Sequence, residues 1–370
     1  NFNEYDLAIA DYKYAASLLS VRYPEDSNSR MHLLLAIANC WYHKRDFAVA
    51  KKKYSHYSVL CKSKYGDQSV EYANSLYYLA NIEGFTNEKQ DGYKDYRQAA
   101  FLLKELIKKQ LRYLPTNART KYWNDLSDIL WNMTAYAVKT GVKQESFACD
   151  AYNALVFSKG LLLESERSMR NLLRQSGTKE DLVLYNKMLL LQSRLTEVER
   201  TTDKGIESAN ELYSQIDQID KQLTSRCSFY GNYTQFLNTQ YEDIKNALKE
   251  GEVAIDFTDF KLDSVHCYAA YVLRKEWEYP LLVPLFNQNQ LDSLYNTVNN
   301  ITDRLYHLPY SQSLLKLCWE SLSHYIHLGE TVYYVPAGTL HQLSLESIAV
   351  TPDSILGDQY HFIRLSSTRE

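Results

Sequence analysis

The amino-acid sequence predicts an α-helical solenoid, followed by a helical hairpin and then by an α/β region. Three observations predict this order: a repeat of about 40 residues near the start, two heptad seams in the middle, and an uneven distribution of proline. Only two of the seven prolines precede Gly251. Proline removes a backbone donor and clashes inside helices, so its distribution marks a change of architecture near that residue.

Glycine and proline are also scarce in the chain as a whole. The 370 residues include 12 glycines and 7 prolines, which is below average usage. A β-sandwich or a β-barrel needs many tight turns, so this composition argues against both. Hydrophobic residues make up 45% of the chain, which argues against disorder.

A sequence repeat covers the N-terminal helices. Segment 6–17 (DLAIADYKYAAS) aligns with segment 46–57 (DFAVAKKKYSHY) at a shift of 40 residues. The coinciding positions are Asp6/Asp46, Ala8/Ala48, Ala10/Ala50 and Tyr14/Tyr54. A pair of helices cannot bury its apolar face alone, so such pairs must stack on one another. A generic helical bundle is the alternative, but it has no reason to repeat at this spacing.

The next helix repeats at a shift of 42 residues, and the repeats have a known counterpart. Ala38-Asn39 recurs as Ala80-Asn81, and a fainter third unit covers 123–138 and 145–157. The run Ala38-x-x-x-Tyr42-x-x-x-Asp46-Phe47-x-x-Ala50 resembles a tetratricopeptide repeat (TPR) with a lengthened second helix. A solenoid of this kind has a concave face, which usually binds a peptide or a protein.

Five residues are candidates to line that concave face. They are Tyr42, Tyr77, Tyr78, Asn81 and Tyr136. Packing between helices is the alternative role for each of them, because helical spacing does not say which face is concave.

Two heptad seams lie between residues 178 and 226. The first consists of Leu184, Met188, Leu191, Leu195 and Val198, and the second consists of Ala209, Leu212, Ile216, Ile219 and Leu223. The polar stretch 201–205 separates them. We therefore predict two antiparallel helices packed as a hairpin. A parallel coiled-coil dimer is the alternative, although each seam is short for one.

From Gly251 onward the hydrophobic pattern becomes strand-like. Short apolar, β-branched or aromatic runs are bounded by polar residues at 253–257 (VAIDF), 268–273 (YAAYVL), 281–286 (LLVPLF) and 332–335 (VYYV). Two helical stretches, about 289–305 and 311–328, lie between the third and fourth runs. This mixture predicts an α/β sheet covered by helices.

Five blocks of sequence, in this order along the chain, resemble a known family. They are YNALVFSKGLLL (152–163), the heptad hairpin, LKEGEVAIDF (248–257), VYYVPAGTLHQLSLESI (332–348) and FIRLSSTRE (362–370). Together they resemble the bacterial TPR-associated CHAT proteins, whose CHAT domain is a caspase-like cysteine peptidase fold related to separase and gingipain. The resemblance covers essentially the whole chain.

The resemblance implies three domains and a hydrolase as the parent family. We expect tetratricopeptide-like helical repeats over 1–160, a helical hairpin linking region over 161–250, and the N-terminal, incomplete part of a caspase-like CHAT α/β domain over 251–370. In the family, the general-base His and the nucleophilic Cys occur in blocks that follow the segment corresponding to RLSSTRE. Neither block occurs in this sequence. We therefore assign no catalytic residue to this chain, and no cofactor or metal ligand.

The histidines and cysteines in the sequence have other candidate roles. His341 lies in the block that the family uses structurally, and Cys318 and Cys267 lie in apolar helical and strand contexts, which favours inert thiols. His324 and His327, three residues apart, could share a metal ion on a helix face, but no Cys, Asp or Glu is spaced to complete the set.

Charge and cysteine usage limit the possible classes of partner and the possible cellular compartment. The chain has 41 Lys and Arg against 45 Asp and Glu, which argues against a dedicated nucleic-acid binder. No segment reaches the roughly 18 apolar residues of a membrane span. The six cysteines are scattered without a Cys-x-x-Cys motif, which indicates a reducing compartment and a cytoplasmic location.

Two functional hypotheses follow. In the first, the chain is the N-terminal, partner-sensing part of a TPR-CHAT cysteine peptidase, whose repeats bind a protein partner and gate a catalytic half located elsewhere. In the second, it is a non-enzymatic TPR scaffold with a degenerate CHAT-like domain. We also expect the sheet begun by 332–335 to be incomplete, with an unpaired apolar edge next to VYYV that strands from beyond residue 370, on a further segment or a second polypeptide, complete.

Overall fold

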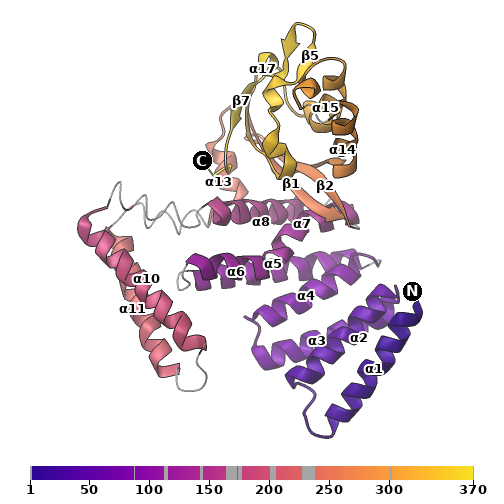
Figure 1. The fold of residues 1–370 in the computed structure, drawn as a ribbon, viewed down its shortest axis with the longest axis vertical. Coiled ribbons are helices and arrows are strands. Elements are labelled where there is room, and N and C mark those ends of the chain that lie inside the picture. Colours follow the sequence, from indigo (N-terminus) through magenta and orange to yellow (C-terminus); the bar gives the residue numbers. More distant parts are fainter. Residues whose placement is uncertain are drawn as a thin grey trace. The chain divides into compact units, whose positions relative to one another are not determined.

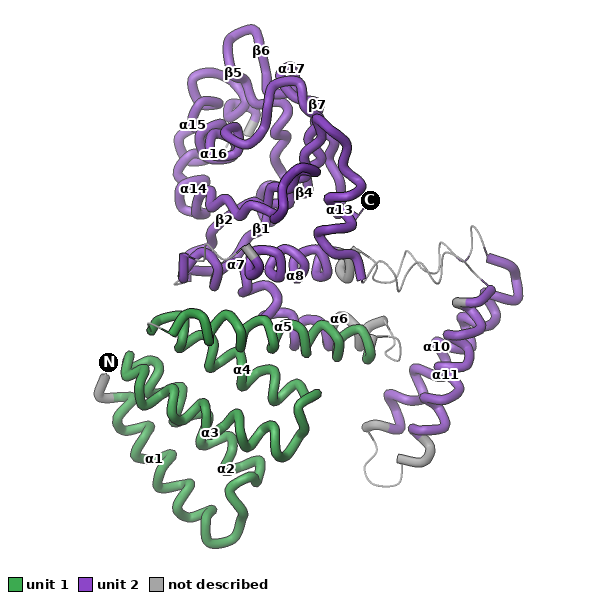
Figure 2. Tube along the Cα trace, turned by 180° about the vertical axis from the view of Figure 1, so that it is seen from behind, with its two compact units in different colours: residues 1–111 green, residues 112–370 purple. Residues whose placement is uncertain are grey.

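The computed structural model describes residues 2–86, 88–111, 116–141, 145–163, 173, 177–200, 206–226, 238–262, 264–299 and 302–369. The chain divides into two compact units, residues 1–111 and 112–370 (Figure 2). The first unit is helical, and the second combines helices with a mixed sheet. This is the order that the sequence predicts, while the finer boundaries at 160 and 250 stay predictions.

Unit 1 contains five consecutive helices, each packed on the next (Figure 1). They are α1 (Phe2–Ser20), α2 (Asn28–His43), α3 (Phe47–Tyr65), α4 (Val70–Glu83) and α5 (Lys89–Leu111). Two begin at side-chain caps: Asp46 accepts a hydrogen bond from the Val49 amide, and Ser69 accepts one from the Tyr72 amide. The repeated residues Ala38, Ala50 and Ala80 are fully buried, so small side chains stand where helices approach one another.

Unit 2 begins with three helices. They are α6 (Thr116–Leu126), α7 (Asp128–Thr140) and α8 (Glu145–Leu163). The stretch 123–138 of the fainter third repeat unit is therefore divided between α6 and α7 at Ser127. Residues 151–159 of α8 are all buried, so this stretch is covered on every side. An α-helix that is enclosed in this way is a core element rather than a surface one.

A helical hairpin forms where the two heptad seams predict it. Helix α10 (Lys179–Arg200) packs on α11 (Ile206–Arg226), and the linking stretch 201–205 lies outside the described residues. Arg226, at the end of α11, forms ion pairs with Glu180 and Asp181 at the start of α10. The two helices are therefore antiparallel. Their shared core includes Met188, Leu191, Leu195, Ile216, Ile219 and Leu223 from the predicted seams.

The main sheet has five strands in the order β3-β2-β1-β4-β7. Their bounds are β1 (Glu252–Leu262), β2 (Val265–Arg274), β3 (Leu281–Asn287), β4 (Thr331–Val335) and β7 (His361–Arg364). The pairs β1–β2 and β2–β3 are antiparallel, whereas β1–β4 and β4–β7 are parallel. All four predicted strand runs lie in β1 to β4.

One expectation about this sheet is wrong. The edge next to VYYV is not unpaired, because β4 pairs with β1 on one side and with β7 on the other. The strand that stands at this edge of the described sheet is β7, which comes from the FIRLSSTRE block. The run HFIR is only four residues long, and it shows no alternation that would mark it as a strand.

Helices cover both faces of the sheet. One face packs on the crossover between β3 and β4, in a core that joins residues such as Val253, Ile255 and Phe257 to Leu291 and Leu314. The crossover consists of α14 (Gln288–Thr297), the 3₁₀ helix η1 (Thr302–Tyr306), α15 (Tyr310–Cys318) and α16 (Glu320–Ser323). The other face packs on α7 (Figure 1). Alternate residues of β1 therefore enter two different cores.

The remaining elements are short. A helix, α13 (Tyr241–Ala247), precedes β1, and the 3₁₀ helices η2 (Gly338–Gln342) and η3 (Leu345–Ser347) follow β4. A small hairpin of β5 (Ala349–Thr351) and β6 (Ser354–Ile355) leads through α17 (Leu356–Gln359) into β7. In the part of the chain that the structure describes, no helix is both long and apolar enough to cross a bilayer.

Candidate functional site

A buried polar cluster joins α8, β1 and the segment that follows β7. Asp256 on β1 has no exposed surface. Its Oδ1 accepts a hydrogen bond from Lys159 Nζ at 3.0 Å, and its Oδ2 accepts from the hydroxyls of Tyr152 and Thr368, both at 2.7 Å. Lys159 Nζ also donates to the Phe257 carbonyl at 2.7 Å. We call these four side chains, Tyr152, Lys159, Asp256 and Thr368, the Asp256 cluster.

Periodicity within α8 and β1 places three of the four members on their faces. Tyr152 and Lys159 lie seven residues apart, so they share one face of α8. Asp256 alternates with Ile255 and Phe257, whose side chains enter the crossover core, so its own side chain points to the opposite face of the sheet. The cluster continues through Tyr152, whose ring stacks on Tyr271 at 5.2 Å between centroids.

Burial shifts the pKa values of two members of the cluster. It lowers the pKa of Lys159, and the neighbouring Asp256 carboxylate opposes that effect. Burial also raises the pKa of Tyr152 well above its ordinary value. Ionised groups without solvent need partners of opposite charge and full hydrogen bonding, and Asp256 has both here. Because Asp256 is also inaccessible, the cluster is suited to holding three segments together rather than to attacking a substrate.

The thiols of Cys318 and Cys267 are not activated for nucleophilic attack. Burial raises the pKa of the Cys318 thiol to about 12, and it raises the pKa of Cys267 as well. Only a thiolate is an effective nucleophile, so both cysteines fit the inert role that the sequence favours. Burial also lowers the pKa of His341, with Arg364 and Lys159 adding to the effect.

The histidine pair does not form a metal centre in the described chain. His324 Nδ1 lies 2.9 Å from the Glu320 carbonyl of its own helix turn, and the amide of His327 donates to Glu330 Oε2 at 2.8 Å. Among the residues that the structure describes, no group of three potential ligands is close enough to hold a metal ion.

Three of the candidates for the concave face, Tyr78, Tyr136 and Tyr42, make contacts with other aromatic rings. Tyr78 stacks on the buried Tyr54 at 5.4 Å, and Tyr136 is buried against Phe147, so both serve packing. Tyr42 instead belongs to an aromatic group with Phe47 and Phe85.

The other two candidates, Tyr77 and Asn81, lie on one turn of α4. Asn81 donates to the Tyr77 carbonyl at 3.0 Å, and the Tyr77 ring meets Tyr96 edge-on. The role of these residues in binding a partner stays a prediction.

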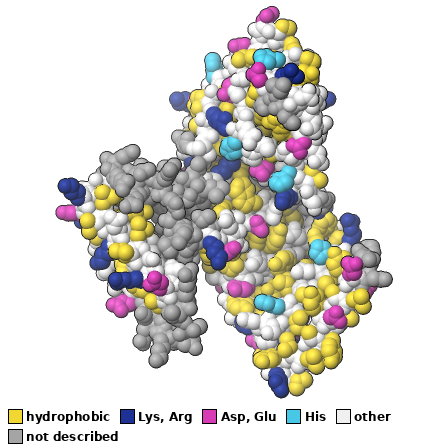
Figure 3. Space-filling model, viewed as in Figure 1, with side chains coloured by type: hydrophobic (Ala, Val, Ile, Leu, Met, Phe, Trp, Pro, Cys, Tyr) yellow, Lys and Arg dark blue, Asp and Glu magenta, His cyan; other side chains and the backbone are white. Residues whose placement is uncertain are grey.

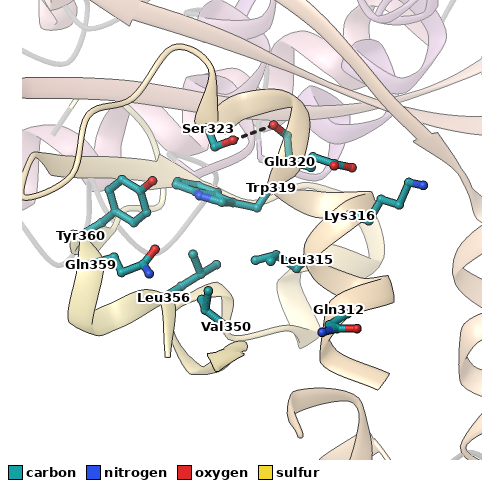
Figure 4. Close-up of a pocket in the computed structure, with 10 residues that line it drawn as sticks. All are labelled: Gln312, Leu315, Lys316, Trp319, Glu320, Ser323, Val350, Leu356, Gln359 and Tyr360. Carbon is teal, nitrogen blue, oxygen red and sulfur yellow. Dashed lines mark hydrogen bonds between the residues drawn. The ribbon is translucent and has the colours of Figure 1, made fainter. Parts of the chain in front are cut away.

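Sequence reasoning missed a cavity of about 330 Å³ in unit 2. It lies between α15–α16 and the segment from Val350 to Tyr360 (Figure 4). Leu315, Leu356 and Trp319 give it apolar walls, and Gln312, Lys316, Glu320 and Gln359 add polar groups. Its lining comes from residues of both segments, so no single motif could have predicted it.

Comparison with known proteins adds no relative to this description. Neither a protein-family model nor a curated protein matches the chain, so the suggestion of a family comes from its own sequence blocks.

Proposed function

We propose that this chain is the N-terminal, partner-sensing and structural part of a TPR-CHAT cysteine peptidase. In this proposal the helical repeats bind a protein partner or regulator, and that binding gates proteolysis by a catalytic half outside this chain. The observation that carries the proposal is the Asp256 cluster. Its members come from three of the blocks that resemble the family: Tyr152 and Lys159 from the first, Asp256 from LKEGEVAIDF, and Thr368 from FIRLSSTRE.

The cluster gives a physical route for gating. Helix α8 stands at the end of the predicted repeats, and Thr368 belongs to the block after which the family carries its catalytic His and Cys. Asp256 bonds to both. A displacement of α8 would therefore separate Lys159 and Tyr152 from Asp256 or move the Thr368 segment with it. Either change would alter the position of whatever follows that segment.

The test begins with the parent gene and ends with an activity assay. The codons that follow residue 370 should encode a His-Gly block and then a Ser-x-Cys block. We expect purified 1–370 not to hydrolyse peptides and the longer polypeptide to do so in a manner that thiol reagents block.

Two outcomes would contradict the proposal. Thiol-sensitive cleavage by 1–370 itself, abolished by Cys267→Ser or Cys318→Ser, would place the nucleophile in this chain. A parent gene without the two blocks would favour the non-enzymatic scaffold.

A further inference from the structure

One lysine of unit 1 serves carboxylates from two neighbouring segments. Lys51 Nζ of α3 lies 2.9 Å from Glu83 Oε1 at the end of α4, and it also forms an ion pair with Glu88, just before α5. The charged side chains visible on unit 1 in Figure 3 are scattered over its surface, whereas Glu83 is only 4% exposed. We call Lys51, Glu83, Glu88 and Asp95 of α5 the carboxylate junction.

Two carboxyl groups of this junction lack a hydrogen-bond donor. Glu83 Oε2 is buried and accepts no hydrogen bond from the described part of the chain. Asp95 is half-buried, and it forms no hydrogen bond or ion pair with the residues that the structure describes. A buried carboxylate oxygen without a donor is costly, because its lost hydration is not replaced.

The packing of α4 on α5 keeps the two carboxyl groups within each other's influence. Tyr77 of α4 meets Tyr96 of α5 edge-on at 5.4 Å, and Asp95 precedes Tyr96 in the sequence. Burial is the main cause that raises the pKa of Asp95 to about 6, and Glu83 contributes more to this shift than any other charge.

Charges from each neighbouring helix act on Asp95. Asp91, one turn earlier in α5, adds to the increase in the pKa of Asp95, whereas Lys94 of α5 and Lys51 of α3 oppose it. Lys51 is already engaged by two other carboxylates. The lysines therefore do not outweigh the carboxylates, and an ionised Asp95 is repelled by its surroundings.

A proton on Asp95 reverses the character of this contact. A protonated carboxyl carries one O–H donor, and an ionised carboxylate carries none. Glu83 has the ammonium group of Lys51 on one oxygen and offers the other as an acceptor. Without the proton, two carboxylates face each other where α4 packs on α5.

We propose that the carboxylate junction is a pH-sensitive contact within unit 1: protonated Asp95 donates a hydrogen bond to Glu83 Oε2 and holds α5 on α4, and ionised Asp95 is repelled by Glu83 and loosens the two helices. Acidification therefore tightens the packing of α4 and α5, and neutral pH makes them easier to separate. The proposal concerns unit 1 alone and does not rest on the peptidase role proposed above.

Proton binding fixes the pH range and the direction of the effect. The unfolded chain loses the Asp95 proton at about pH 3.9, the ordinary value for aspartate. The folded chain keeps it up to about pH 6. The folded state therefore binds more protons between these two values, and its stability falls as the pH rises from about 4 to about 6.

Hydrogen exchange of the whole chain, measured by mass spectrometry in peptides from α4 and α5, tests the contact at pH 5 and pH 7. Asp95→Asn is the informative variant, because its amide donates to Glu83 at both pH values. The ratio of exchange rates, natural chain over variant, should be about fivefold larger at pH 7 than at pH 5. Comparison of the two chains at the same pH removes the intrinsic effect of pH on exchange.

Two further variants identify the cause of the change. Asp11→Asn, which alters an exposed aspartate of α1 outside the junction, should give the same ratio at both pH values. Glu83→Gln removes the charge that repels ionised Asp95 and supplies an amide that donates to it. In that background, Asp95→Asn should lose most of its pH dependence.

A ratio for Asp95→Asn that stays the same between pH 5 and pH 7 would overturn the proposal. An equal change for Asp11→Asn would also overturn it, because the effect would then come from net charge. A change that persists in full with Glu83→Gln would assign the effect to the burial of Asp95 alone, and the proposed pairing with Glu83 would be wrong.

Discussion

Asp256 is a carboxylate with no exposed surface, and its burial is offset by donors from α8 and from the segment after β7. A buried ion pair adds little net stability compared with an apolar pair, but removal of one partner is costly because it leaves the other charge without compensation. Replacement of one member of the Asp256–Lys159 pair should therefore lower the stability of the chain much more than replacement of both.

We predict that Asp256→Ala destabilises the chain by about 3–5 kcal/mol, because it strands the ammonium group of Lys159 in the interior. The double variant Asp256→Leu with Lys159→Met should recover most of that loss. Urea unfolding followed by circular dichroism measures both, with Asp259→Ala on the same strand as the control. A loss below about 1 kcal/mol in Asp256→Ala would show that water reaches the cluster.

A second buried ion pair makes stability depend on pH. Arg274 at the end of β2 bonds to both oxygens of Glu330, just before β4. Burial works against ionisation of Glu330, but the hydrogen bonds from Arg274 and the His327 amide prevail and lower its pKa. A carboxyl whose pKa is lower in the folded chain stabilises the fold above its unfolded pKa, about 4.3, and this contribution is lost as the pH falls through the folded value.

Glu330→Gln should therefore reduce the free energy of unfolding at pH 7 by about 1–3 kcal/mol, because Arg274 loses one of its two carboxylate partners and keeps Glu276. The natural chain should lose stability more steeply between pH 4.5 and pH 3 than the variant does. Urea unfolding at pH 7, 5, 4 and 3 compares the two slopes. Parallel curves would mean that Glu330 titrates as it does in the unfolded chain.

At the scale of elements, β7 is the edge strand on this side of the described sheet. The amide of His361 donates to the carbonyl of Glu330, just before β4, and the amide of Leu365 donates to the carbonyl of Tyr334 on β4. Backbone groups alternate in direction along a strand, so those of Phe362 and Arg364 point away from β4. A strand edge of this kind can accept another strand. That a further segment completes the sheet stays a prediction.

We predict that 1–370 self-associates through β7 and that Arg364→Pro reduces this association, because proline removes an outward-pointing donor. Ile363→Pro is the matched comparison. Its amide points toward β4, so this variant should instead destabilise the sheet. Size-exclusion chromatography with light scattering reports association, and urea unfolding reports stability. A natural chain that runs as a clean monomer would contradict the prediction.

At the scale of the whole molecule, units 1–111 and 112–370 each have buried cores of their own. Chains with more than one core often depart from two-state unfolding. We therefore predict two transitions in differential scanning calorimetry. Ala38→Leu, which overpacks a helix crossing of unit 1, should lower one transition, and Asp256→Ala should lower the other. Equal shifts of both transitions by either variant would show that the chain unfolds as one unit.

Elements with a strong period were predictable from sequence, and contacts between distant segments were not. The hairpin seams and β1 to β4 have residue patterns that burial itself imposes. The strand β7 is too short to show one. Asp256 lies within the apolar run VAIDF, and its partners Lys159 and Thr368 lie 97 and 112 residues away in the sequence. No spacing rule connects residues that far apart, so the cluster could be identified only from the folded structure.

The enclosure of α8 has a consequence for how this chain can change over generations. A surface helix accepts substitutions on its solvent side, so positions that tolerate substitution alternate with buried positions that do not, once per helical turn. Residues 151–159 offer no such side, since each of them is buried. Almost any replacement there removes a packed group or introduces one that does not fit. We therefore expect the sequence of this stretch to diverge more slowly than that of the helices around it, at every position rather than only on one side.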